Sequence, residues 1–179
     1  MDPAKSQQRL KSWIAVTVSL ALGACGSNGV ATGPDTSATP QGAELAKSRG
    51  GHGLLICKPQ PYTRVTQSIG RQGGTIKFGN ENTLEIPAGA LLTTVTISAE
   101  VLSDSLRSVR FEPHGLVFLA PVKLNIWYDG CDTKGLPSRK IAYLDAVEAI
   151  LELLLSRDYP KGEWVSGQLW HFSRYAVAW

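Results

Sequence analysis

The sequence predicts an all-β fold, an antiparallel sandwich or barrel, for the part of the chain after residue 53. Three observations support this prediction. Apolar and polar residues alternate with a period of two, β-branched residues are dense, and Gly, Pro and Asn interrupt the chain at close spacing. This pattern is typical of short strands joined by tight turns, which bury one face by forming a closed or two-layered structure.

The expected strands follow one another along the chain. They cover residues 75–78, 83–86, 95–101 and 122–128, with one or two more in 164–179. The second strand stops at Pro87, because proline has no N–H to give to a ladder. In the fourth strand, alternate residues share one face. These residues are Val122, Leu124, Ile126 and Tyr128.

Residues 145–156 conflict with this pattern. They are good helix formers, and four of their apolar side chains fall on one face of a helix. These are Val147, Ile150, Leu151 and Leu154. Local propensity therefore predicts a short helix. The neighbouring strands favour a strand over residues 150–155 instead, since tertiary context can override propensity. Both alternatives stay open at this point.

The composition fits one globular domain. The chain has 179 residues, of which 43% are apolar and 18% are charged. The formal net charge is +3, and residues 1–24 account for +2 of it, with Lys5, Arg9 and Lys11 against Asp2. The remaining +1 gives no electrostatic reason to expect a nucleic acid as partner.

The first residues have the organisation of an export signal. A positively charged start is followed by the mostly apolar run 12–22. As a helix this run spans about 16 Å, roughly half of a bilayer core, which fits a signal peptide and not a membrane span. Leu22-Gly23-Ala24-Cys25 then resembles the lipobox of bacterial lipoproteins, in which an aliphatic and two small residues precede a cysteine.

The lipobox resemblance implies that residues 1–24 are a signal peptide and that Cys25 carries the lipid. Each buried methylene of an acyl chain contributes about 0.8 kcal/mol, so we expect an exported chain that is lipid-anchored to the cell envelope, with the membrane as one partner. Gly26 in place of Asp implies no retention at the inner membrane. In a host with two membranes we therefore expect the outer membrane, with the domain facing the periplasm or the surface. The alternative is an ordinary secretory signal with an unrelated cysteine.

A linker separates the expected anchor from the domain. Residues 25–53 are rich in Gly, Ser, Thr, Ala and Pro and show no sustained period, which predicts a flexible tether. Its reach as a random coil is on the order of 30 Å. The folded domain is then expected to cover residues 54–179.

The remaining cysteines are Cys57 and Cys131. In an exported protein this pair predicts a disulfide, and the alternative is two buried free thiols. The three histidines lie far apart in the sequence and no C-x-x-C motif occurs. The sequence therefore predicts no metal site and no cofactor.

Three motifs of the domain resemble a ZU-type domain, which is shared by zonula occludens protein, netrin receptors and ankyrins. They are Gly73-Gly74 with Ile86-Pro87-Ala88-Gly89-Ala90, the stretch 111–122, and His171-Phe172-Ser173-Arg174-Tyr175. Together they cover roughly residues 68–179 in the family's order. The resemblance implies a β-sandwich used for protein contacts. A group of bacterial lipoproteins of unknown function carries a similar domain. No death domain is recognised, so a receptor-signalling role is not expected.

Some animal members of the ZU-type family cleave themselves between Phe and Ser of a His-Phe-Ser motif. His171, Phe172 and Ser173 match it. Residues i and i+2 of a strand share a face, so His171 is expected beside the Ser173 hydroxyl as its general base. The reaction also needs a distorted peptide and oxyanion donors. The alternative is a structural role, with Phe172 buried and Ser173 hydrogen-bonded locally.

The sequence therefore predicts a binding or envelope-structural module with a protein partner, and not an enzyme that acts on an outside substrate. No G-x-S-x-G, P-loop or H-E-x-x-H motif is present. One alternative is self-processing at Ser173. The other is polysaccharide binding by exposed tryptophans, although core or sheet-edge positions are more common for such residues. The tryptophans of the domain are Trp127, Trp164, Trp170 and Trp179.

Overall fold

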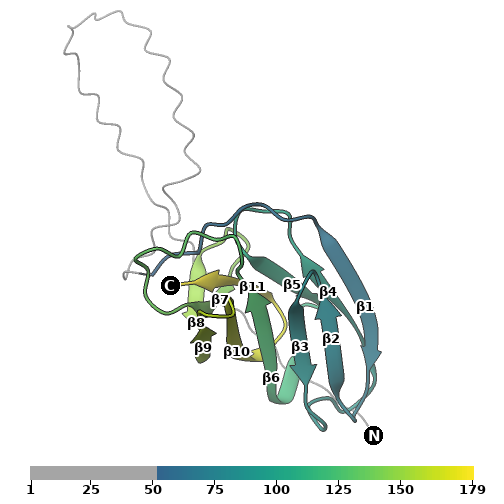
Figure 1. The fold of residues 1–179 in the computed structure, drawn as a ribbon. Coiled ribbons are helices and arrows are strands. Elements are labelled where there is room, and N and C mark those ends of the chain that lie inside the picture. The colour runs from purple at the N-terminus through teal and green to yellow at the C-terminus, as the bar shows by residue number, and fades with distance from the viewer. Residues whose placement is uncertain (1–51) are drawn as a thin grey trace, which may run out of the picture. The chain divides into compact units, whose positions relative to one another are not determined.

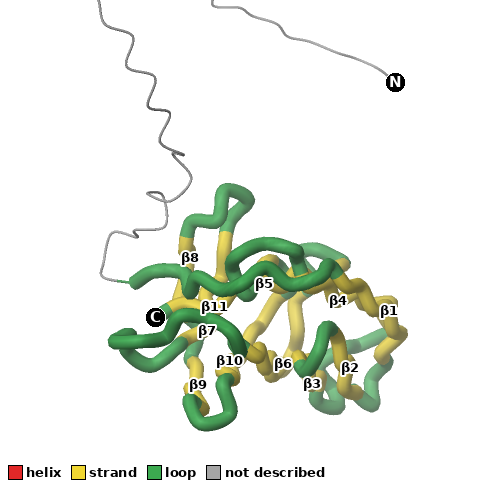
Figure 2. Tube along the Cα trace, turned by 45° about the horizontal axis from the view of Figure 1, so that its top comes forward, coloured by secondary structure: helices red, strands yellow, loops and turns green. Residues whose placement is uncertain are grey.

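A computed structural model describes residues 52–179 of the chain, and these residues form eleven strands and no helix (Figure 2). The strands are β1 (Thr63–Ile69), β2 (Gly74–Phe78), β3 (Asn82–Ile86), β4 (Val95–Val101), β5 (Ser108–Glu112), β6 (Val117–Trp127), β7 (Lys140–Leu144), β8 (Ile150–Leu153), β9 (Ser156–Tyr159), β10 (Trp164–His171) and β11 (Arg174–Ala178). The predicted signal peptide, Cys25 and almost all of the linker lie outside the described residues. No helix of the described part is long and apolar enough to cross a membrane.

Two antiparallel sheets pack face to face, which confirms the predicted β-sandwich (Figure 1). The first sheet has the strand order β1-β4-β5-β11-β7-β8, and the second has the order β2-β3-β6-β10-β9. The main core lies between them, and the ring of Phe111 packs 5.5 Å from Phe78 and 5.0 Å from Phe172. The predicted inward face of residues 122–128 is confirmed, because Val122, Leu124, Ile126 and Tyr128 are all buried.

Pro121 lies inside a strand. β6 continues through it. The register between β6 and β10 shifts between Leu169 and His171, opposite this part of β6. A proline is tolerated at such an irregularity, because no ladder N–H is required there. By contrast, β3 ends at Ile86, immediately before Pro87, as predicted.

The segment 145–156 is a turn followed by strands, so the helix alternative is wrong. The strand alternative is confirmed over Ile150–Leu153, and residues 154–155 connect β8 to β9. The Asp145 carboxylate accepts hydrogen bonds from the backbone N–H groups of Val147 and Ala149, at 2.9 and 2.8 Å. β8 then places Ile150 and Leu153 against an apolar cluster on the outer face of the first sheet. Burial against this cluster therefore outweighs the local helix propensity.

The sandwich has two ends, at which different segments of the chain lie. At the proximal end, where the described chain begins, Gly53 and Trp179 exchange two backbone hydrogen bonds, with N···O distances of 3.3 and 3.0 Å. β11 runs from Arg174 towards Trp179, so the turn before Arg174 lies at the opposite, distal end. The strand registers bring four further connections to the distal end, at residues 70–73, 87–94, 113–116 and 145–149.

Candidate functional site

The motif His171-Phe172-Ser173 lies at the distal end, where β10 passes into β11. Phe172 is fully buried, and its ring stacks on Phe111 and meets Phe118 edge-on at 4.9 Å. Ser173 is only 3% exposed. Phe172 is therefore a core residue that holds the adjacent peptide bond in a fixed position.

Ser173 lies beside a different histidine from the one that the sequence suggested. Its Oγ is 3.4 Å from Nε2 of His114, in the connection between β5 and β6. The His171 ring instead packs edge-on against Tyr143, and its Nδ1 is 3.4 Å from the Tyr175 hydroxyl. The expectation of a His171–Ser173 pair is wrong because β10 ends at His171, so strand alternation does not continue to residue 173.

Tyr175 fixes His171 in this position. Its hydroxyl donates a hydrogen bond of 2.5 Å to the His171 carbonyl oxygen. Burial raises the pKa of the Tyr175 hydroxyl, so this group stays protonated and keeps its role as donor over the ordinary pH range.

The carbonyl group between Phe172 and Ser173 accepts a hydrogen bond from the connection between β5 and β6. The Gly115 N–H donates to the Phe172 oxygen at 3.0 Å, and the Phe172 N–H donates to Leu116 at 2.8 Å. A general base beside the hydroxyl and a donor on the carbonyl that it would attack are two of the parts an acyl shift requires.

The third part is a distorted peptide, and neither Phe172 nor Ser173 has a positive φ. Among residues 52–179 the one cis peptide precedes Pro113, and the only non-glycine residues with positive φ are Glu148 and Glu163. Gly115 has a φ of 76°, which suits glycine and lets its N–H reach the Phe172 carbonyl. The site is thus an ordered arrangement of nucleophile, imidazole and donor, with neither Phe172 nor Ser173 in the left-handed region.

A cleft of about 570 Å³ opens beside Ser173. His114, Glu112, Arg174 and Leu151 are among the residues that line it. Arg174 is held by two carboxylates, at 3.0 Å from Asp104 and 2.8 Å from Glu148. The cleft therefore has no strong anion-binding character, because both of its guanidinium groups, those of Arg110 and Arg174, already have carboxylate partners.

The tryptophans are arranged differently from a sugar platform. Trp164 lies between two other rings, parallel to Tyr159 at 3.8 Å and to Trp127 at 5.4 Å. These ring faces cover one another across β6, β10 and β9. Trp179 packs against Gly53, and only Trp170 is well exposed, at 54%. The polysaccharide-binding alternative therefore depends on Trp170.

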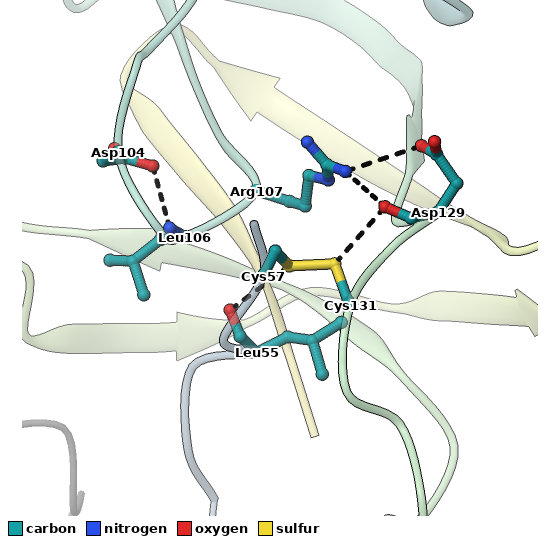
Figure 3. Close-up of a disulfide and its surroundings, with 7 residues drawn as sticks. All are labelled: Leu55, Cys57, Asp104, Leu106, Arg107, Asp129 and Cys131. Carbon is teal, nitrogen blue, oxygen red and sulfur yellow. Dashed lines mark hydrogen bonds and ion pairs between the residues drawn. A yellow bond between two sulfur atoms is a disulfide. The ribbon is translucent and has the colours of Figure 1, made fainter. Parts of the chain in front are cut away.

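The predicted disulfide is confirmed: Cys57 and Cys131 are bonded at the proximal end (Figure 3). It joins the segment before β1 to the connection between β6 and β7. Beside it, the Arg107 side chain donates to the Asp129 backbone carbonyl and lies 3.6 Å from the Asp129 carboxylate. Within residues 52–179 no group of three or more His, Cys, Asp or Glu side chains is arranged to hold a metal ion.

Sequence reasoning missed His114 and Gly115 as neighbours of the Phe172–Ser173 peptide. Both belong to the stretch 111–122, which we used only for the family resemblance. His114 and Ser173 are 59 positions apart, and no local pattern joins them. No protein-family model matches this chain, and no curated protein matches its sequence.

Proposed function

We propose that the chain is an exported lipoprotein, anchored through Cys25, whose β-sandwich of the ZU type is a protein-contact module of the cell envelope. The observation that carries the contact role is the position of its exposed large apolar side chains. Two of them, Ile56 and Tyr62, belong to the segment at the proximal end. The others lie at the distal end or along the adjoining edge: Leu92, Val117, Leu119, Val147, Leu151, Leu155 and Trp170.

Four of these side chains form what we name the distal patch: Leu92, Val117, Leu119 and Trp170. The Leu119 N–H donates to the Ala90 carbonyl at 3.0 Å, which brings the backbone near Leu92 beside β6. Val117 pairs with His171, next to Trp170. Single exposed apolar residues are common on soluble proteins, whereas a contiguous group of them marks an interaction site.

Photo-crosslinking in native membranes tests the contact role. A photoreactive residue placed at Leu119 or Trp170 is expected to capture one and the same protein, and the same residue at Ile56 or Tyr62 is the matched control. Equal capture from both ends, or capture of lipid alone, contradicts the proposal.

A second function, self-processing, is favoured by one specific arrangement: the Ser173 hydroxyl beside His114, with the Gly115 N–H on the Phe172 carbonyl. The Ser173 Oγ would attack the Phe172 carbonyl carbon and pass its proton to His114. The C–N bond then breaks, and the Ser173 nitrogen takes that proton. Water opens the resulting ester to a Phe172 carboxylate and a free Ser173 amine.

The intact mass of the chain purified from native membranes, denatured and non-reduced, tests both the anchor and self-processing. A chain that begins at Cys25 and carries acyl mass supports the lipoprotein assignment. A fragment that begins at Ser173 supports self-processing, and its loss in His114→Ala but not in His171→Ala identifies the general base. An unbroken chain in all three proteins rules self-processing out.

A further inference from the structure

The sandwich has four edge strands, and three of them are protected. β1 carries Arg64, which is ion-paired to Glu100 at 3.4 Å, and β2 carries the exposed Lys77. β9 carries the exposed Arg157. Charged or covered edges prevent a sheet from taking on further strands. β8 also carries a charge, that of Glu152, but it differs in exposing large apolar side chains: Leu151 within it is 56% exposed and Leu155 just after it is 78% exposed.

The backbone of β8 has an outer side without a neighbour among the described strands. The Leu154 N–H donates to the Ile141 carbonyl of β7 at 2.8 Å. Because such bonds alternate along an antiparallel pair, the N–H and C=O of the adjacent Leu153 point away from β7. They are available to a further strand.

The two faces of β8 each adjoin a cleft. The cleft of about 570 Å³ is lined by Leu151 and Arg174, among others. A smaller cleft of about 240 Å³ is lined by residues that include Glu152, Trp170 and Tyr175. Arg174 and Tyr175 are consecutive in β11 and therefore point to opposite faces of the first sheet. Alternate side chains of an added strand would enter one cleft or the other.

The one charged residue within β8 is acidic. Glu152 is exposed on the strand itself, and Glu148 in the preceding turn has a side chain that is 45% exposed. Two guanidinium groups line the larger cleft beside β8, and both are already paired: Arg110 with Glu100, and Arg174 with Asp104 and Glu148. A complementary strand therefore carries basic side chains on the face of Glu152 and apolar ones on the face of the larger cleft.

The local sequence of β8 also contradicts its structure. Residues 145–156 favour a helix, yet they form a turn and an exposed apolar edge. Conflicts between local preference and final structure concentrate at functional sites. This second, independent observation singles out the same strand.

We propose that β8 is a docking edge, which accepts an extended segment of a protein partner as an additional strand, with alternating apolar and Lys or Arg side chains. This inference rests on the proposed function, since it names how a contact module recognises its partner. Backbone hydrogen bonds to Leu153 supply the pairing, and Glu152 selects the basic sequence.

Peptide binding to the full chain in lipid nanodiscs tests this proposal. The probe is a peptide of about ten residues that alternates valine and lysine, a length typical of a strand. A glutamate version and a version N-methylated at alternate positions are the comparison peptides.

Glu152→Lys is expected to weaken binding of the lysine peptide by roughly tenfold or more, which is about 1.4 kcal/mol, and to strengthen binding of the glutamate peptide. Glu81→Lys, an exposed change of the same charge in the turn between β2 and β3, is the matched control and should bind as the unmodified chain does.

Three results overturn the docking edge. They are no binding of the lysine peptide, equal binding by the N-methylated peptide, and self-association of the chain that Glu152→Lys abolishes. The last would make a second copy of the chain the occupant. If crosslinks from the distal patch capture a partner while β8 binds no peptide, the contact role stands and only the docking edge fails.

Discussion

The proximal and distal ends of the sandwich use their side chains in opposite ways. The proximal end is fastened by a disulfide, by the Gly53–Trp179 backbone pair and by Tyr128, whose hydroxyl donates to Asp158 at 2.6 Å. The distal end leaves Val117, Leu119 and Trp170 in solvent. The covalent fastening thus lies where the described residues begin, and most of the exposed large apolar side chains lie at the opposite end or along the edge that adjoins it. In the proposed lipoprotein, this separation allows the domain to bind a partner without loosening its attachment.

Removal of the disulfide should produce the largest effect. The bond closes a loop of 74 residues, and a loop of that length stabilises the fold by about 4 kcal/mol through the unfolded chain. Urea unfolding of Cys57→Ser/Cys131→Ser should show a loss of this size. A loss below about 1 kcal/mol would mean that hydrogen bonds and packing hold the proximal end without the bond.

Truncation of Trp164 tests the aromatic stack, and Trp170→Ala is its matched control at the distal end. Trp164 is half-buried between Trp127 and Tyr159, so Trp164→Ala should cost about 2 kcal/mol, less than the ~3–5 of a fully buried tryptophan. Trp170→Ala should cost less than about 0.5 kcal/mol, because its ring is 54% exposed. Thermal or urea unfolding measures both, and equal losses would break the distinction between the ends.

The pH dependence of the unfolding free energy at alkaline pH tests one group of the proximal end, the Tyr128 hydroxyl. Burial, together with the hydrogen bond to Asp158, raises the pKa of Tyr128 to about 12 from its ordinary value of 10.0. The folded state therefore keeps the proton that the unfolded chain releases, and stability is lost as the pH rises from 10 towards 12. In Tyr128→Phe this part of the decline should disappear. An unchanged pH dependence of the unfolding free energy would show that Tyr128 titrates normally.

The sequence predicted most reliably those features that depend on local patterns. β3 and β6 alternate because one face of each is buried, and Pro87 ends β3 for a local reason. The Cys57–Cys131 bond followed from having only two candidates after Cys25 in a chain that we expect to be exported. The pairing of Ser173 with His114 was not predictable, because it depends on how β5, β6 and β11 meet in three dimensions. β8 was ambiguous, since its helix propensity competes with burial that only the assembled sheet provides.

The smallest effect on stability is expected from polar substitutions in the distal patch. Val117 and Leu119 are 69% and 61% exposed on the outer side of β6, so Val117→Ser with Leu119→Ser removes little buried area. The unfolding free energy should change by less than about 0.5 kcal/mol, while crosslinking from Trp170 to a partner should be lost. Ile126→Ser is the control on the same strand: Ile126 is 1% exposed, and its substitution should cost several kcal/mol by leaving a cavity and burying a hydroxyl. If the two surface changes destabilise the fold as much as Ile126→Ser does, the distal patch is part of the core and the contrast between the ends is lost. If they leave both stability and crosslinking intact, contact is made elsewhere, with the β8 edge as the next surface to test.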